Sequence, residues 1–435
     1  MGSQVARVLV EQRTLMSQRV GAPVKLIGVA VRDVEAPRDW RIPGELLTTD
    51  AESLVDQADL VIELMGGLEP AGDLIARALR AGTAVVTGNK ALLAAQGPYL
   101  HGLAEESGAL LNFEAAVAGA IPILRPIQES LAGDRITKVM GIVNGTTNYI
   151  LDQMDSTGAS FQDALTEAQR LGYAEADPTA DVEGHDAAAK AAILGTLAFH
   201  SPFTIDDVYC EGITQITLED MNAAAASGYV IKLLAIAERV ENAGADEAGE
   251  PTPGVILRTH PTLLPRTHPL ASVRGAFNAV FVVADNAGEL MFYGQGAGGT
   301  PTSSAVLGDV VTAARRLRGS FPESASIGTG QEIPALSVEQ ARTQYYIDLD
   351  VADEEGVIAE IARVLADQHV SIESMRQPGS VSPEGEVDTD QDNGAAVQIV
   401  THLAREQDLQ STVGALHSLR VVRSVNSVLR VEVEK

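Results

Sequence analysis

The sequence is poor in cysteine, in basic residues and in long apolar runs. Its 435 residues include one cysteine, and 31 lysines and arginines stand against 59 aspartates and glutamates, a net charge of −28. One cysteine excludes a disulfide framework and a cysteine-ligated metal site within one chain, and fits a reducing compartment. The acidic balance disfavours nucleic acid and anionic membranes as partners. No uncharged apolar run approaches the roughly 20 residues of a membrane helix, and no signal-peptide pattern opens the chain, so we expect a cytoplasmic protein.

The first third of the chain alternates short apolar runs with helical patterns. Strands are expected at 24–33, 58–67 and 83–92, the last running into a loop, with a helix at 71–82 that Gly82 ends. This rhythm predicts an α/β fold, a doubly wound parallel sheet with helices on both faces. Such sheets bind ligands at the carboxyl ends of their strands.

The rest of the chain predicts two further domains. Residues 126–300 are expected to form an α+β domain, with long helices at about 159–171 and 184–199. Its strands are expected near 136–143, 207–213 and 275–293, and an acidic, Gly- and Pro-rich exposed loop at 241–254. After a linker at 321–343, strands and helices follow in the order βαββαβ around an acidic loop at 379–394, which predicts a ferredoxin-like domain.

The opening stretch "MGSQVARVLVEQ" predicts an amphipathic helix with no strand before it. A dinucleotide site is usually strand, G-x-G-x-x-G, helix, and Gly2 fits the last glycine of that motif. A frayed N-terminal helix explains the same pattern. We hypothesise that the natural protein starts upstream, so that the first strand and two glycines of the motif precede this sequence.

Three charged residues predict a catalytic cleft. Lys90 in "GNKAL" follows a predicted parallel strand and would face the ligand crevice, although a strand-end lysine is often solvated. Asp186 and Lys190 are spaced i, i+4 and share one helix face. In a cleft the lysine could move a proton to or from a carbonyl or hydroxyl oxygen, whereas on the surface the pair would be an ordinary ion pair. Glu175 and Asp177 in the preceding loop add acceptors for a substrate ammonium or hydroxyl.

A glycine-rich loop, "YGQGAGGTPTSSAVLGDVV" at 293–311, precedes another predicted helix. Thr302 or Ser303 is expected to cap that helix, whose start would attract anions. A plain flexible turn is the alternative, and the density of glycine favours ligand contact.

Taken together, these stretches resemble the homoserine dehydrogenase family, in the form that carries a C-terminal ACT domain. The resemblance rests on "GNKALL" (88–93), "FEAAVAGAIPI" (113–123), "GIVNGTTNYIL" (141–151), "LGYAEADPTADVEGHDAAAK" (171–190) and "FNAVFVVADNAGELMFYGQGAGGTPTSSAV" (277–306). It implies NAD(P)H-dependent reduction of L-aspartate 4-semialdehyde to L-homoserine, on the route to threonine and methionine. It implies four regions: an NAD(P)-binding domain at 1–125, a catalytic and dimerisation domain at 126–320 whose helix at 301–320 packs back on the first, the linker at 321–343, and an ACT domain at 344–430.

The resemblance assigns roles to particular residues. Lys190 matches the proton donor and acceptor, Asp186 its neighbour in the site, and Glu175 the carboxylate that binds homoserine. Lys90 matches a lysine beside nicotinamide and substrate. The cofactor is further expected at Gly2, Arg32, Gly172, Gly296 and Gly298. Arg32, with Arg38 nearby, favours NADPH, and NADH is the alternative because Asp33 could hold a ribose 2′-hydroxyl.

The resemblance also implies a cation and protein or effector partners. Glu114, with the backbone carbonyls of Val117, Gly119 and Ile121, matches a sodium-type monovalent cation site, and oxygen ligands suit a hard cation. A homodimer through the middle domain, or a homotetramer with paired tails, is implied. The tail would sense threonine, although "DEEG" (353–356) has Glu355 where the ACT pattern has proline.

Two alternatives stay open. Aspartate semialdehyde dehydrogenase forms a thioester on cysteine, but Cys210 in "DDVYCEGIT" has no histidine next to it in sequence, so we expect a packing role. A catalytically silent amino-acid-sensing or subunit-pairing protein would keep the tail without the cofactor site. The Glu175, Asp186 and Lys190 set favours the enzyme, and the missing glycines favour the silent protein.

Overall fold

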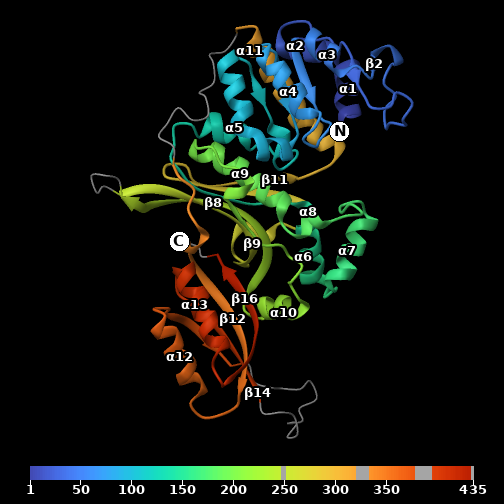
Figure 1. The fold of residues 1–435 in the computed structure, drawn as a ribbon. Coiled ribbons are helices and arrows are strands. Elements are labelled where there is room, and N and C mark those ends of the chain that lie inside the picture. Colours follow the sequence, from blue (N-terminus) through green and yellow to red (C-terminus); the bar gives the residue numbers. More distant parts are fainter. Residues whose placement is uncertain (246–250, 320–332, 378–393, 433–435) are drawn as a thin grey trace.

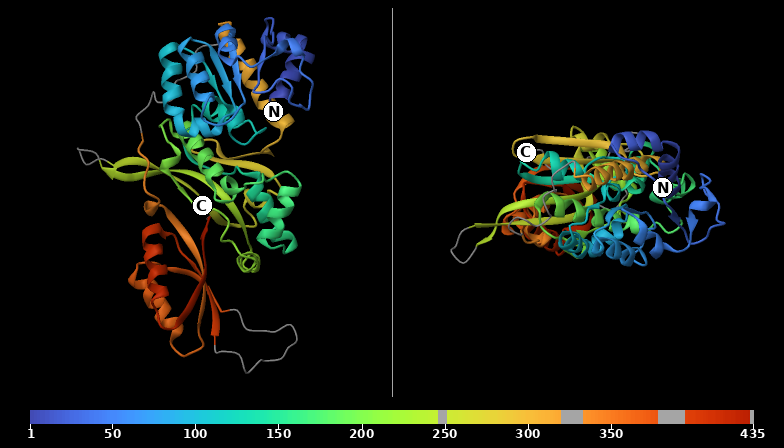
Figure 2. Two further views of the ribbon diagram at one scale, coloured as in Figure 1. Left: turned by 45° about the vertical axis from the view of Figure 1, so that its right-hand side comes forward. Right: turned by 90° about the horizontal axis from the view of Figure 1, so that it is seen from above.

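The structure, a computed structural model, describes residues 1–245, 251–319, 333–377 and 394–432. Its helices and strands form three parts stacked along one axis, with the N-terminal part at one end and the C-terminal part at the other (Figures 1 and 2). No helix of the described residues is both long enough and apolar enough to span a membrane.

The N-terminal part is an α/β layer structure. Its helices are α1 (Gly2–Glu11), α2 (Arg13–Val20), α3 (Ala51–Gln57), α4 (Ala71–Arg80) and α5 (Lys90–Ser107). Its strands are β1 (Val29–Ala30), β2 (Leu47–Thr48), β3 (Leu60–Glu63), β4 (Ala84–Thr87) and β5 (Leu111–Asn112). Strands β3, β4 and β5 pair in parallel, and β1 pairs with β2 in a separate parallel pair.

Helices cover both faces of the three-stranded sheet, as predicted. Val85 of β4 packs in a core with α3, α4 and α5, and Val86 packs on the other face with α1, α2 and α11 (Gly299–Leu317). The alternation follows from the two-residue period of a strand. Helix α11 therefore packs against the N-terminal part although it follows the central part in sequence (Figure 1).

Two predictions for this part are wrong in extent. The strand expected at 24–33 is reduced to Val29–Ala30, because its described pairing is with β2 alone. The loop expected after β4 is instead the start of α5, because the Asn89 side chain accepts a hydrogen bond from Leu92 N and caps a helix there. Lys90 is therefore the first residue of a helix.

The central part is built on a long antiparallel hairpin of β8 (Tyr229–Ala245) and β9 (Pro251–Pro265). The other strands are β6 (Ile136–Ile142), β7 (Val208–Cys210), β10 (Phe277–Ala284) and β11 (Gly288–Gln295). The helices are α6 (Gly145–Thr157), α7 (Phe161–Arg170), α8 (Thr179–Val182), α9 (His185–Phe199) and α10 (Leu218–Ala226). Helix α9 packs against both β8 and β9 (Figure 1).

The prediction for the central part misses several of these elements. The loop expected at 241–254 is strand at both of its described ends, while 246–250 lie outside the described residues. Strand β8 is buried continuously from Val230 to Ala237, so it lacks the alternation that identifies a strand. Helix α6 was not predicted because its buried residues include polar ones, among them Asn148 and Asp152.

The C-terminal part has the predicted βαββαβ order. It comprises β12 (Arg342–Ala352), α12 (Val357–Asp367), β13 (Ile372–Arg376), β14 (Gly394–Thr401), the short β15 (Ala404–Arg405), α13 (Glu406–His417) and β16 (Val422–Val431). The sheet order is β16-β12-β14-β13, and β16 also pairs in parallel with β9. One continuous sheet thus joins the central and C-terminal parts. The expected loop at 379–394 and most of the linker lie outside the described residues.

Candidate functional site

The candidate site lies where three element ends meet: the start of α5, the β6–α6 junction and the first turns of α9. Gly184 takes a left-handed conformation, with φ of 83°, immediately before α9. A Cβ there would lie 3.0 Å from the carbonyl oxygen of Glu211, so glycine allows α9 to begin close against the loop that follows β7. The sequence thereby fixes the position of the first α9 turn, which carries Asp186.

Asp186 and the two predicted lysines meet in one cluster. Lys190 Nζ donates to Asp186 Oδ2 at 2.7 Å and to the carbonyl oxygen of Val143 at 2.6 Å. Lys90 Nζ forms an ion pair with Asp186 Oδ1 from the other side. The side chains of Lys190 and Asp186 are 8% and 4% exposed, whereas that of Lys90 is 46% exposed. The i, i+4 pair is therefore buried rather than a surface ion pair, and Lys90 connects it to solvent.

The charges and the burial of this cluster shift the pKa values of both Asp186 and Lys190. Burial alone would raise the pKa of Asp186, but Lys190 and Lys90 outweigh burial and hold that pKa well below its usual range. Burial lowers the pKa of Lys190 below that of a free lysine, Asp186 opposes this shift and Lys90 adds to it. A buried lysine whose pKa lies below that of a free lysine gives up and regains a proton more readily than a solvated one.

Asn144, which the sequence analysis did not single out, joins this cluster, and Thr146 beside it anchors the next loop. The Asn144 side-chain amide donates to Asp186 Oδ2 at 2.9 Å and to Asp181 Oδ1 at 2.6 Å. Thr146 Oγ1 donates to the carbonyl oxygen of Tyr173 at 2.7 Å. The available signal was "GIVNGTTNYIL", in which an Asn-Gly-Thr-Thr run after an apolar strand is typical of a helix start.

Glu175 lies in the loop that these residues anchor. The loop from α7 to α8 is held at Tyr173 by Thr146 and at Asp181 by Asn144, so both ends are fixed to the start of α6. Glu175 is exposed and its carboxylate has no hydrogen-bond or ion-pair partner in the described part of the chain. Asp177 instead accepts from the backbone and hydroxyl of Thr179, so its carboxylate is engaged at the loop beside α8.

The glycine-rich loop lies against the predicted cation loop. Ala120 N donates to the carbonyl oxygen of Gln295, and a Cβ on Gly119 would lie 2.2 Å from the carbonyl oxygen of Gly296. The cap of α11 differs from the prediction. Gly298 precedes the helix, and Thr302 and Ser303 lie inside it, because Gly298 at φ 119° admits a turn that starts α11 at Gly299.

The Glu114 side chain lies in a buried polar group beneath the same loop. Its carboxylate accepts from the backbone N–H groups of Ile123, Leu124 and Arg125 and from Arg125 Nε. Asp309 of α11 accepts from Glu114 N at 2.8 Å, and burial raises its pKa to about 7. Within the described residues, no group of three or more His, Cys, Asp and Glu side chains could hold a metal ion.

The remaining predicted cofactor residues lie at the surface or at helix ends. Gly2 starts α1, and a Cβ on Gly299 would lie 3.5 Å from Met1 N, so the starts of α1 and α11 are adjacent. Arg32 is exposed, while Arg38 donates to the carbonyl oxygens of Val34 and Ala36 in its own loop. Gly172 ends α7 at φ 76° and is exposed.

A cavity of about 250 Å³ lies farther along α5 and α9. It is lined largely by apolar residues, among them Leu93, Phe113 and Leu197, together with His101. Burial lowers the pKa of His101 to about 4, so this imidazole is neutral near pH 7. None of the predicted site residues lines this cavity, so it is separate from the Asp186 cluster.

Comparisons with known proteins agree on one family. Residues 122–311 match the family model described as homoserine dehydrogenase, and residues 1–114 match the model of the homoserine dehydrogenase NAD binding domain. The chain is 50% identical to the homoserine dehydrogenase of Corynebacterium glutamicum over 434 residues, 99% of this chain and 93% of that protein.

Solved structures point the same way. A homoserine dehydrogenase from Thiobacillus denitrificans superposes with a TM-score of 0.87 at 38% identity, over 99% of this chain and 95% of that one. A hyperthermophilic archaeal homoserine dehydrogenase in complex with NADPH superposes with a TM-score of 0.59 at 26% identity, over 75% of this chain and 96% of that one.

Proposed function

The chain belongs to the homoserine dehydrogenase family, and we propose that its buried Lys190 carries the proton of the family's reaction. Homoserine dehydrogenase is an NAD(P)-dependent oxidoreductase that acts on a CH–OH group, reducing L-aspartate 4-semialdehyde to L-homoserine in amino-acid biosynthesis. The observation that carries the proposal is the burial of Lys190 with its two acceptors, Asp186 and the Val143 carbonyl.

The proton chemistry follows from the charges. Reduction of an aldehyde builds negative charge on its oxygen, and a fixed ammonium stabilises that charge and then protonates it. In the reverse direction the neutral amine of Lys190 accepts the proton of the homoserine hydroxyl. Asp186 orients the lysine in both directions and limits how far burial lowers its pKa. Lys90, partly exposed on the other side of Asp186, would place a second positive charge near the substrate oxygen.

Glu175 is proposed to bind the substrate ammonium. Its carboxylate is exposed and unpaired in the described part of the chain, on a loop tied to the same α6 start that supplies Asn144. A carboxylate free of partners can accept from an ammonium without first breaking an ion pair. The loop therefore offers a binding group near the proton-transfer pair.

The dinucleotide is proposed to lie at the adjacent starts of α1 and α11. Neither helix has an acidic residue in its first turn or a side-chain cap, and the free N–H groups of such a helix start fit a pyrophosphate. Gly2, Gly296 and Gly298 would let its backbone approach closely. Arg32, exposed after β1, would meet a ribose phosphate and favour NADPH, and Gly172 would contact the cofactor through its backbone. When bound, the nicotinamide supplies the hydride.

A monovalent cation is proposed in the loop before the π-helical turn at Pro126–Ser130. The carbonyl oxygens of Val117, Gly119 and Ile121 accept no hydrogen bond from the described residues, and such oxygens suit a sodium-type ion. The carboxylate of Glu114 already accepts four hydrogen bonds, so it would act through its negative charge rather than as a direct ligand.

The domain roles are part of the same proposal. Residues 1–125 would bind the cofactor, 126–320 would hold the substrate and form a homodimer, and 344–430 would form an ACT domain that binds an amino acid such as threonine. The βαββαβ order and the β16-β12-β14-β13 sheet support the last assignment. Pairing of these tails would give a homotetramer.

The test replaces Lys190 by methionine, which keeps the length and removes the charge. We expect NADPH oxidation with aspartate 4-semialdehyde to fall by at least about 100-fold, while cofactor binding measured by nicotinamide fluorescence is retained. The matched control is Lys232→Met, because Lys232 is an equally buried lysine that contacts Asn148 Oδ1 and the Val273 carbonyl instead. Near-normal turnover in the Lys190→Met enzyme would remove Lys190 from the mechanism.

A further inference from the structure

Asn144 makes contacts that a helix cap alone does not need. It lies between β6 and α6 and is 6% exposed. Its carbonyl oxygen Oδ1 accepts from Thr147 N at 2.9 Å and from Thr147 Oγ1 at 3.0 Å, which caps α6. Its amide nitrogen donates to two carboxylates, one on α8 and one on α9.

The orientation of the Asn144 amide is settled by its neighbours. The Thr147 backbone N–H is only a donor, so the atom facing it is the amide oxygen. The NH2 group then faces Asp181 and Asp186, both of which accept. A reversed amide would place its oxygen against two carboxylates, so this orientation is the one in which every contact pairs a donor with an acceptor.

We propose that Asn144 is a positioning residue that fixes the carboxylate of Asp186 and, through it, the ammonium of Lys190. Asp186 Oδ2 accepts from both Asn144 and Lys190, while its Oδ1 faces Lys90. The residue before Asn144 supplies the second acceptor of Lys190, the Val143 carbonyl. One dipeptide therefore holds both members of the buried pair. The inference rests on the roles proposed above for Lys190 and Asp186.

A carboxamide combines these functions where other caps do not. Serine or aspartate caps a helix N-terminus about as well as asparagine. Serine is too short to bridge two carboxylates, and aspartate would add a third carboxylate to Asp181 and Asp186. If capping were the whole role of Asn144, all three residues would support similar turnover.

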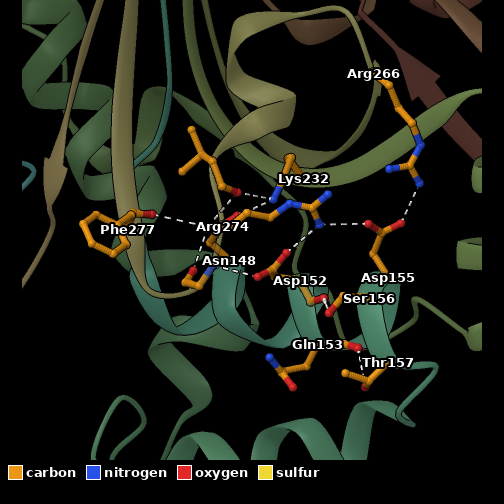
Figure 3. A network of polar contacts seen from close by, with 12 residues as sticks. Asn148, Asp152, Gln153, Asp155, Ser156, Thr157, Lys232, Arg266, Arg274 and Phe277 are labelled. Carbon is orange, nitrogen blue, oxygen red and sulfur yellow. Dashed lines mark hydrogen bonds and ion pairs between the residues drawn. The ribbon is translucent and has the colours of Figure 1, made fainter.

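The first test is Asn144→Ser, which keeps the cap and removes the bridge. We expect kcat for homoserine oxidation to fall by about 10- to 100-fold with little change in KM, because misplacement of the proton acceptor affects the chemical step. The matched control is Asn148→Ser, the same change one turn along α6. Asn148 is equally buried but contacts Lys232 and the Gly275 carbonyl (Figure 3). It should lower thermal stability and leave kcat near that of the parent.

The second test is Asn144→Asp, which is isosteric and keeps the cap if the serine variant folds poorly. The groups facing Lys190 are Asp186 of its own helix, Lys90 of α5 and Asp181 of α8. A further carboxylate raises the pKa of Lys190, so the pH at which homoserine oxidation reaches half its plateau should move upward. If Asn144 only capped α6, the plateau kcat of Asn144→Asp would stay near that of the parent.

The outcomes separate this inference from the proposed function. Equal kcat losses in Asn144→Ser and Asn148→Ser, with a parent-like plateau kcat in Asn144→Asp, would overturn the positioning role while Lys190→Met still abolished turnover. Turnover retained in Lys190→Met would instead overturn the proposed roles themselves. A kcat loss confined to the Asn144 variants, together with the upward pH shift, would establish the positioning role.

Discussion

At the residue scale, the carboxylate of Asp186 forms ion pairs with two lysines. Asp186 pairs with Lys190 inside the protein and with Lys90 at its surface, so two positive charges share one negative charge. Two ammonium groups at one position suit a reaction that builds negative charge on a substrate oxygen. A single lysine would supply less stabilisation at the transition state.

Cys210 is predicted to be dispensable for turnover. The sequence shows no histidine near it, but the fold places His185 Nδ1 4.0 Å from Cys210 Sγ. Burial nevertheless raises the pKa of the thiol, and Glu211 and Glu183 raise it further, so the reactive thiolate is disfavoured. We expect Cys210→Ala to retain kcat within about threefold, because the thiol contributes packing and a weak hydrogen bond to the Glu183 carbonyl rather than chemistry.

The measurement is steady-state turnover of Cys210→Ala, with the thermal midpoint recorded in parallel. Iodoacetamide treatment of the parent enzyme gives the matching chemical test, and the pKa shift predicts slow labelling. A large loss of kcat in a Cys210→Ala protein with an unchanged midpoint would assign the thiol a chemical role instead.

Local spacing explains which site residues could be predicted. The i, i+4 rule places Asp186 and Lys190 on one face, and the strand-end rule brings Lys90 to the crevice. The role of Asn144 could not be predicted because its two partners lie 37 and 42 residues away in the sequence. Only the fold brings α6, α8 and α9 together. The same limit applies to His185 and Cys210, which are 25 residues apart.

At the element scale, periodicity predicted amphipathic elements and missed buried ones. Helices α4, α7 and α9 are close to their expected ranges. The hairpin of β8 and β9 was missed because continuous burial removes the strand period, and α6 because its buried side chains are polar. Helix ends depend on caps, so the start of α11 at Gly299 rather than near Thr302 followed from backbone geometry at Gly298.

Helix α11 carries a prediction about pH. Asp309 is 1% exposed and its pKa is raised by burial from 3.8 to about 7. A carboxyl whose folded-state pKa is raised gives full stability below its unfolded pKa, and that stability is lost as pH rises through the folded pKa. As the pH rises from about 4 to 7, the free energy of unfolding of the parent protein should therefore fall by up to about 2–4 kcal/mol because of Asp309.

The variant Asp309→Asn removes this titration. Asparagine can still accept from Glu114 N. The stability of the variant minus that of the parent should therefore be larger at pH 8 than at pH 5. Thermal midpoints of both proteins at the two pH values, in buffers of equal sodium concentration, give the comparison. A variant-to-parent difference that is the same at both pH values would show that Asp309 is ionised throughout.

At the scale of the whole molecule, Arg430 adds a charged contact between the C-terminal part and the loop beside α9 to the strand pairing of β16 with β9. Arg430 of β16 donates to Glu406 Oε1 at 2.6 Å within its own part and to Glu211 Oε2 at 2.6 Å in the central part. The Glu211 carbonyl in turn lies against Gly184, immediately before α9. Arg430, Glu211 and Gly184 therefore form a chain of contacts from β16 to the start of the helix that carries Asp186.

The variant Arg430→Met is expected to weaken the C-terminal part first. Burial opposes the charge of Arg430, but Glu406 and Glu211 more than compensate and keep its pKa above the ordinary value. Removing the guanidinium leaves Glu406, which is fully buried, without its cation, at a cost of about 3–5 kcal/mol. Differential scanning calorimetry should show a transition that separates from the main one and moves to lower temperature.

The control Glu211→Gln distinguishes coupling from stability. The Glu211 side chain is 42% exposed, so its neutralisation leaves no buried charge unpaired and should shift the calorimetric transition little. It does remove the charged contact between Arg430 and the loop beside Gly184. If the C-terminal part binds threonine, the response of turnover to threonine should weaken in Glu211→Gln although its stability is kept. An unchanged response in that variant, with a single transition at the parent temperature in Arg430→Met, would show that the arginine connects the two parts without transmitting a signal.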